Sequence, residues 1–255
     1  ALPQSPQQYK QLLMLSGFDR YFQIARCFRD EDLRADRQPE FTQIDLEMSF
    51  VDQEDVMTVN EGFMKRVFKE VLDVEIPTPF QRMPYQEAMD RFGSDKPDLR
   101  FGMELQDLSD LLKDCTFKVF RGALDAGGSV RAIVAKGAAD TLSRKEIDKL
   151  VEFVKTYKAK GLAYTRLTHD GESSSYEKFL TEEEKQAIRT RLGAEKGDVI
   201  LVVADGSNQV VYDSLGALRC HLGARLGLIQ PGVFRFLWVT QFPLFEYSEE
   251  EGRYV

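Results

Sequence analysis

The sequence is poor in the residues that build covalent or metal-based scaffolds, with 3 cysteines, 2 histidines and 1 tryptophan among 255 residues. The cysteines are odd in number and scattered, at Cys27, Cys115 and Cys220. This argues against a disulfide framework and favours reduced thiols in a cytosolic compartment. With only His169 and His221 and no C-x-x-C pair, we expect no structural zinc site.

Two further absences concern membranes and nucleic acid. No apolar run approaches the ~18 residues that suggest a membrane span. The first ten residues, ALPQSPQQYK, lack both an initiator Met and a signal-peptide pattern. We therefore expect a soluble, cytoplasmic chain that is entered partway through a longer protein. The net charge of -8 argues against broad binding of a phosphate backbone, but it is compatible with a local basic site.

What is present is typical of a globular protein, with 43% hydrophobic and 30% charged residues and a length that suits one large or two smaller domains. After Ser5-Pro6, apolar residues at helical spacing predict a first helix. Residues 20–28 (RYFQIARCF) and 40–50 (EFTQIDLEMSF) predict the two strands of a long antiparallel hairpin. The second strand alternates a polar face with an apolar one. Residues 52–72 then predict an amphipathic helix.

The later part of the chain alternates short strands with helices. Strands are predicted at 115–120 and 130–135, joined by a Gly127-Gly128 turn, and at 162–167, 198–205 and 234–247. Helices are predicted at 143–161, where Ser143 and Glu146 suggest a capping box and Gly161 a stop, and at 182–192 and 208–226. Stretches rich in Pro and Gly fit domain boundaries. We therefore expect an α+β chain, with a core segment at 1–104, an inserted α+β domain at 105–231 and a return to the core at 232–255.

A loop dense in charge of both signs, RDEDLRADRQPE, joins the two strands of the hairpin at residues 29–40. An arginine presents a planar fork that grips phosphate or carboxylate through two parallel hydrogen bonds. Nearby carboxylates can hold that fork, accept from amino groups or coordinate Mg²⁺, and the flanking Phe28 and Phe41 can stack on a planar base. The loop therefore fits a nucleotide site. Composition alone favours a solvated, salt-bridged hairpin tip, whose exposed ion pairs contribute only about 0–1 kcal/mol each.

The order of the residues reverses that preference. FRDE followed by RQPEFTQIDLEMSF resembles motif 2 of the class II aminoacyl-tRNA synthetases. The wider string from LPQSPQQYK to EMSF is similar to the bacterial-type aspartyl-tRNA synthetases, and FGSDKPDLRFGMEL and LWVTQFPLFE match the same family. The stretch between these last two resembles the inserted GAD domain of that family. The resemblance covers essentially the whole chain, and it implies part of an antiparallel-sheet catalytic core that ligates aspartate to tRNA with ATP.

The resemblance also implies roles for single residues of an ATP site. Arg29 is similar to the arginine that binds the α-phosphate of ATP, where it would offset charge that develops as the amino-acid carboxylate attacks phosphorus. Glu31 matches the acid that faces the adenine amino group, and Phe41 matches the ring that stacks on adenine. Gln38 matches a further ATP contact. Mg²⁺ is expected, with its ligands outside this chain.

Aspartate and tRNA contacts follow from the same resemblance. Lys10 would pair with the side-chain carboxylate of aspartate, Gln7 would bind its ammonium group, and Asp45 would be a second ammonium partner. Arg34 and Arg37, at the loop tip, fall where the family meets the tRNA acceptor end. The parent protein is expected to be a homodimer that binds tRNA, L-aspartate and ATP and has no membrane partner.

Several alternatives stay open on the sequence alone. Asp45 and Glu47 could be solvent-facing strand residues, and Lys10 could be an exposed helix lysine. Gln241 stands where the family often has Asp. The anticodon-binding domain and motif 3 of the family have no counterpart in this sequence, so we expect the chain alone to be inactive. The chain could also be a stable binding module dominated by its inserted domain, or a class II-like paralogue that does not charge tRNA.

Overall fold

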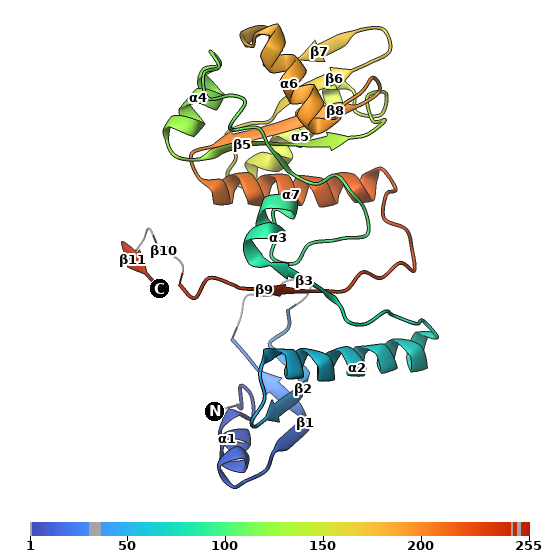
Figure 1. The fold of residues 1–255 in the computed structure, drawn as a ribbon, viewed down its shortest axis with the longest axis vertical. Helices are drawn as coiled ribbons and strands as arrows, with labels where there is room; N and C mark the ends of the chain where they lie inside the picture. The colour runs from blue at the N-terminus through green and yellow to red at the C-terminus, as the bar shows by residue number, and fades with distance from the viewer. Residues whose placement is uncertain (1, 31–36, 246, 249–250) are drawn as a thin grey trace. The chain divides into compact units, whose positions relative to one another are not determined.

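The structure is a computed structural model that describes residues 2–30, 37–245, 247–248 and 251–255. Its chain forms two compact units, Ala1–Phe80 and Gln81–Val255. The first unit contains the helices and strands predicted for it (Figure 1): α1 (Gln7–Leu15), β1 (Arg20–Phe28), β2 (Glu40–Met48) and α2 (Gln53–Leu72). The strands pair antiparallel along their whole length, from Arg20 opposite Met48 to Phe28 opposite Glu40. The predicted hairpin is therefore confirmed.

The two faces of the hairpin are covered unequally. Ile24 lies opposite Ile44 on the apolar face, and their exposed fractions are 70% and 51%. On the other face, Ala25 and Cys27 are buried, and Lys10 of α1 is buried as well. The helix α1 contacts both strands. The face that carries the polar residues of β2 is thus the covered one.

The second unit contains the remaining elements (Figure 1): β3 (Gln81–Pro84), α3 (Tyr85–Phe92), β4 (Gln106–Asp107), α4 (Lys118–Asp125), β5 (Ser129–Ala135), α5 (Arg144–Lys155), β6 (Ala163–Leu167), β7 (Glu172–Ser174), the 3-10 turn Glu177–Phe179, α6 (Glu182–Leu192), β8 (Val199–Asp205), α7 (Asn208–Arg225), β9 (Leu237–Thr240), β10 (Tyr247–Ser248) and β11 (Arg253–Tyr254). Five of these strands form one antiparallel sheet in the order β4-β5-β8-β6-β7. The α+β fold class is therefore confirmed.

Both faces of this sheet are buried. Residues 133 and 135 of β5 and 199, 201 and 203 of β8 pack with α5 and α7 in one core cluster. Residues 130, 132 and 134 of β5 and 200 and 202 of β8 pack in a second cluster with α4 and α6. Because side chains alternate along a strand, a strand with helices on both faces is apolar throughout. This is why VRAIVA and VILVVA carry almost no polar residues.

The strand predicted at residues 115–120 is wrong, because α4 begins within it, at Lys118. Phe120 and Ala123 are buried in α4, and with Phe117 they lie three residues apart along the chain. That spacing places them on one side of a helix and not on one side of a strand. Gly127, with φ +83°, follows the helix and leads into β5, so the predicted strand–turn–strand is a helix–turn–strand.

The capping box predicted for α5 is half formed. The Ser143 side chain accepts from the backbone N–H of Glu146 at 3.4 Å. The Glu146 carboxylate does not return to the cap; it pairs with Lys149 at 2.7 Å and with Arg225 of α7. The helix ends at Lys155, before the predicted stop at Gly161. Glu146 thus pairs with Lys149 and Arg225 in place of the hydrogen bond that a capping box would make to the Ser143 backbone N–H.

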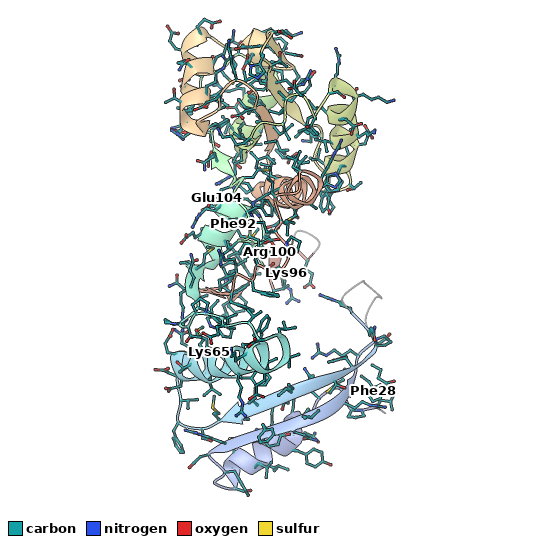
Figure 2. All side chains as sticks on the ribbon, turned by 90° about the vertical axis from the view of Figure 1, so that its right-hand side faces the viewer. Phe28, Lys65, Phe92, Lys96, Arg100 and Glu104 are labelled. Atoms are coloured by element: carbon teal, nitrogen blue, oxygen red, sulfur yellow. The ribbon has the colours of Figure 1, made fainter. Side chains whose placement is uncertain are left out.

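A buried arginine joins α7 to the segment that follows α3. The Arg219 side chain is fully buried, and its guanidinium donates to the backbone carbonyls of Asp98, Phe101 and Gly102 at 2.7–3.1 Å. It also lies 4.1 Å from the ring centroid of Phe101 and 4.9 Å from that of Phe92. Figure 2 shows Phe92 at the end of α3, with Lys96, Arg100 and Glu104 on the segment beyond it. The guanidinium of Arg219 therefore fixes the backbone of FGSDKPDLRFG to α7 through the carbonyls of three of its last five residues.

The strand predicted at residues 234–247 is confirmed in part. Among the described residues of this range, Leu237–Thr240 forms the strand β9, which pairs in parallel with β3, and Tyr247 begins the two-residue strand β10. The strands before and after the five-stranded sheet are therefore neighbours, as an insertion requires. The compact unit begins at Gln81 and includes α3. The boundaries at 104/105 and 231/232 stay predictions.

Candidate active site

The polar face of the β1–β2 hairpin gathers several of the predicted site residues. Phe41 and Asp45 both point to this face, because they are separated by an even number of residues along β2. Lys10 reaches the same face from α1, and Arg29 reaches it from the end of β1. Residues far apart in sequence thus meet on one surface of the first unit.

Lys10 forms the most buried ion pair of this face. Its Nζ lies 3.1 Å from Asp45 Oδ1 and 3.1 Å from Glu47 Oε2, and the Lys10 side chain is 11% exposed. Burial lowers the pKa of Lys10, but the hydrogen bonds and negative charges of Asp45 and Glu47 outweigh it, so the pKa lies above its ordinary value. The three groups carry a net charge of about -1 when Lys10 is protonated and both acids are ionised.

Asp45 keeps one unused acceptor. Its Oδ1 accepts from Lys10, whereas its Oδ2 is buried and has no hydrogen-bond partner among the residues that the structure describes. An unsatisfied buried polar group costs about 1–3 kcal/mol. A cationic or amino group of a ligand would remove that cost. Asp45 is therefore not a plain solvent-facing residue, and Lys10 is not an exposed helix lysine. Glu47 is 38% exposed and pairs with Lys10.

Arg29 and Phe41 lie together at the other end of this face. The guanidinium carbon of Arg29 is 5.0 Å from the centroid of the Phe41 ring. The Arg29 backbone N–H donates to the Pro39 carbonyl at 2.9 Å, which extends the hairpin by one bond beyond β1. A cation and an aromatic ring side by side can bind a phosphate and a planar base.

The remaining predicted residues fall in three groups. Gln7, the first residue of α1, is exposed and lines a hollow of about 510 Å³, together with residues 3–6, 8–9, 23, 25 and 26. Gln38 and Arg37 are exposed beside β2. Glu31 and Arg34 lie outside the described residues.

Two groups of this face were not among the predicted site residues. Glu47 is the second partner of Lys10. Gln43 lies between Phe41 and Asp45, and its Oε1 accepts from the buried thiol of Cys27 at 3.1 Å. The two-residue period of EFTQIDLEM was the signal that could have found both, because it places residues 41, 43, 45 and 47 in one row.

Other kinds of site are not evident in the described part of the chain. No group of three or more His, Cys, Asp or Glu side chains there is placed to hold a metal ion. None of the described helices is long and apolar enough to span a membrane. A hollow of about 610 Å³ lies in the second unit, between α4 and strands β6 and β8, and no predicted site residue lines it.

Comparisons with known proteins point to one family. The family model for class II tRNA synthetases (D, K and N) matches residues 1–252. The chain is 64% identical over 255 residues to an aspartate–tRNA ligase of Ruminiclostridium cellulolyticum. It is 60% identical over 254 residues to aspartate–tRNA ligases of Clostridium botulinum strains Kyoto and Hall. All of this chain is covered, but it spans only 43% of the first relative's length and 42% of each of the other two.

Proposed function

Because the chain belongs to the class II tRNA synthetases (D, K and N), we propose that it carries part of the catalytic site of an ATP-dependent aspartate–tRNA ligase. The observation that carries the proposal is the polar hairpin face, which pairs a buried cation and two carboxylates at one end with an arginine and an aromatic ring at the other. The first end suits a zwitterionic amino acid with a carboxylate side chain. The second suits a nucleoside phosphate.

In the proposed reaction, aspartate and ATP first form aspartyl-adenylate and pyrophosphate. Phe41 stacks on adenine, with Glu31 and Gln38 as further ATP contacts. Arg29 binds the α-phosphate and offsets the charge that grows during attack by the aspartate carboxylate. Positioning dominates such a step, because both reactants are held in line before the bond forms. Mg²⁺ would be held by residues outside this chain.

At the aspartate end, the ammonium group binds Asp45 Oδ2 and Gln7, and the side-chain carboxylate binds Lys10. The unused acceptor of Asp45 supports this assignment, since an ammonium group would supply the missing donor. The adenylate is then attacked by the acceptor end of tRNA, with Arg34 and Arg37 as RNA contacts. We place the parent protein in the cytoplasm as a homodimer.

The test uses a full-length protein that contains this chain and measures aspartate-dependent exchange of pyrophosphate into ATP. Arg29→Ala should lower kcat/KM by about 100-fold or more, as removal of one preorganised charge-stabilising donor does. Arg29→Lys should also be impaired, because an ammonium group lacks the bidentate fork. Arg66→Ala is the control, since Arg66 is an exposed partner of Glu70 on α2. Near-normal exchange in both Arg29 variants would refute the assignment.

A further inference from the structure

The hollow of about 610 Å³ in the second unit has no part in the proposed reaction. It lies between α4, the strands β6 and β8, and residues 160–162, which lead into β6. The helices α4 and α6 pack on the same face of the five-stranded sheet and lie apart along it (Figure 1). The volume is within the range of small-molecule sites, about 300–1,000 Å³. The hollow is therefore large enough to hold a small organic ligand.

Small residues keep this hollow open. Ala163 of β6 and Ala204 of β8 line it from the sheet, and Gly122 lines it from α4. A Cβ added to Gly122 or to Gly161 would meet nothing within 4 Å, and neither glycine has a positive φ. Glycine weakens a helix relative to alanine. Since neither backbone conformation nor a close neighbour requires glycine at these places, their effect is to leave the space unfilled.

The wall of the hollow is apolar and already in place. Phe117 stacks on Phe179 with ring centroids 5.0 Å apart, and it meets the ring of Phe120 edge-on at 4.8 Å. Phe120 and Val202 are each 1% exposed and belong to the second core cluster. An apolar ligand that enters such a preformed wall gains buried surface without ordering new side chains.

The charged residues that line the hollow favour a ligand with one negative charge. They are Lys118, Lys160 and Asp205, so two cations and one carboxylate leave one positive charge. Lys160 Nζ lies 3.7 Å from Asp205 Oδ2, and these two charges offset each other. Lys118 has neither an ion pair nor a hydrogen bond from its side chain among the described residues. Its charge is the one that a ligand can neutralise.

We propose that this hollow binds a small organic anion, a carboxylate with an aliphatic or aryl body. The apolar body lies against Phe117 and Val202, and the carboxylate pairs with Lys118. The Lys160 side chain is 85% exposed, so it can turn toward the same carboxylate. A ligand with two or more negative charges fits less well, because it finds one uncompensated cation beside a largely apolar wall.

The test is a fluorescence titration of a full-length protein that contains this chain, with two probes that share one body. Anilinonaphthalene sulfonate carries a single negative charge on an aromatic body. Phenylnaphthylamine has the same body without the charge. Both probes gain fluorescence in apolar surroundings, and we expect the wild-type protein to bind both at a saturable site.

Two variants fill the hollow. Gly122→Leu and Gly161→Leu each add a side chain where a Cβ has open space. Each should lower the affinity for both probes by about tenfold, the effect of removing about 50 Å² of buried apolar surface. The control is Gly62→Leu in α2, where an added Cβ also meets nothing within 4 Å, and it should leave both affinities unchanged. Melting temperatures verify that each variant is folded.

A third variant tests the charge. Lys118→Gln should weaken the sulfonate probe by about three- to fivefold, the effect of one exposed ion pair, and should leave phenylnaphthylamine unchanged. Lys145→Gln is the control, because Lys145 is an exposed lysine in the first turn of α5 that does not line the hollow.

The outcomes are distinct. If folded Gly122→Leu and Gly161→Leu bind both probes as the wild type does, the hollow is not the binding site and the proposal is refuted. Absence of saturable binding to the wild-type protein also refutes it. If the filled variants lose both probes but Lys118→Gln keeps full affinity for the sulfonate, the preference for an anion is refuted.

Discussion

At the scale of single residues, Lys10 links the two carboxylates of the proposed aspartate site. Its charge offsets one of the two acids, which lie two residues apart on the same face of β2. Truncating one member of a buried, hydrogen-bonded charge set leaves the others uncompensated, which typically costs about 3–5 kcal/mol. Lys10 therefore contributes to the fold even without substrate.

We expect Lys10→Ala to destabilise the first unit and, under the proposed function, to raise the aspartate requirement of the full-length protein. The loss of aspartate binding should be about 2–5 kcal/mol, by analogy with truncated buried pairs, with less effect on ATP. Lys69→Ala is a matched control, because Lys69 also pairs with two carboxylates, Asp73 and Glu75, but is exposed. Equal losses of ATP and aspartate affinity would indicate damaged folding instead.

The pKa of Lys10 sets the pH range of this contribution. Because the folded-state pKa lies above the ordinary value of 10.5, the stabilisation is complete below pH 10.5 and is lost as pH rises through the folded-state pKa. The difference in free energy of unfolding between wild type and Lys10→Met should therefore shrink only in strongly alkaline solution. Urea unfolding at a series of pH values from 8 upward would measure this, and a decline that is complete by about pH 9 would contradict it.

Gln241 occupies an unfavourable backbone conformation. Its φ of +56° lies in the left-handed region, which Asn and Asp tolerate better than Gln does. We expect Gln241→Asn to stabilise the second unit by about 0.5–1 kcal/mol, measured as a rise in the urea midpoint. Gln186→Asn, in the helix α6, should not stabilise it.

At the scale of elements, α7 is shaped to meet the backbone after α3. A Cβ added at Gly216 would lie 2.5 Å from the Gly93 carbonyl oxygen and 2.9 Å from that of Phe92. Only a residue without a side chain permits this approach. One turn further along α7, the guanidinium of Arg219 donates to three backbone carbonyls of the segment after α3. The two residues together fix α3 to α7.

We therefore expect Gly216→Ala to destabilise the second unit although alanine favours helix. The clash is with backbone, which cannot move aside cheaply, so the cost should be at least about 2 kcal/mol. The matched control is Gly122→Ala in α4, where an added Cβ meets nothing within 4 Å. That variant should be stabilised by about 0.5–1 kcal/mol. Thermal unfolding of both variants measures the contrast, and equal effects would contradict the role of Gly216.

At the scale of the whole molecule, the predicted inserted domain at 105–231 forms buried contacts with the segment before it. A fragment of residues 105–231 keeps Arg219 but loses the carbonyls and rings that surround it. The unit Gln81–Val255 retains these contacts.

We expect residues 81–255 to fold with a higher melting temperature than residues 105–231. If the orphaned Arg219 costs about 3 kcal/mol, the difference should be about 6–12 °C. Differential scanning calorimetry of the two fragments would measure it, and Arg219→Met in the longer fragment should lower its melting temperature in the same direction. Equal melting temperatures would show that the contacts of Arg219 contribute little.

The catalytic expectation also belongs to this scale. The 255-residue chain by itself should form no measurable aspartyl-adenylate, because groups that act as a unit lose far more than their share of rate when some are missing. A pyrophosphate-exchange assay with the chain alone tests this. Robust adenylate formation would mean that the 255-residue chain carries all the groups that activation requires.

The sequence by itself determined the hairpin, the helix at 182–192 and the row of residues 41, 43, 45 and 47. These follow from local patterns, namely two-residue alternation and apolar residues at helical spacing. Motif order also identified the family. The sequence did not predict the helix at Lys118–Asp125, because TFKVF has a strand-like composition. The packing of Phe120 against the sheet selects the helix.

Only the tertiary structure decided which face of the hairpin is covered and which charges meet there. Alternation shows which side chains share a face, but the face that is covered depends on what packs against it from elsewhere in the chain. Lys10 and Asp45 are 35 residues apart, and their 3.1 Å contact arises because α1 lies on the polar face. Likewise, the burial of Arg219 could not be read from GALRCH, because its acceptors are backbone carbonyls at residues 98–102, which carry no sequence signal.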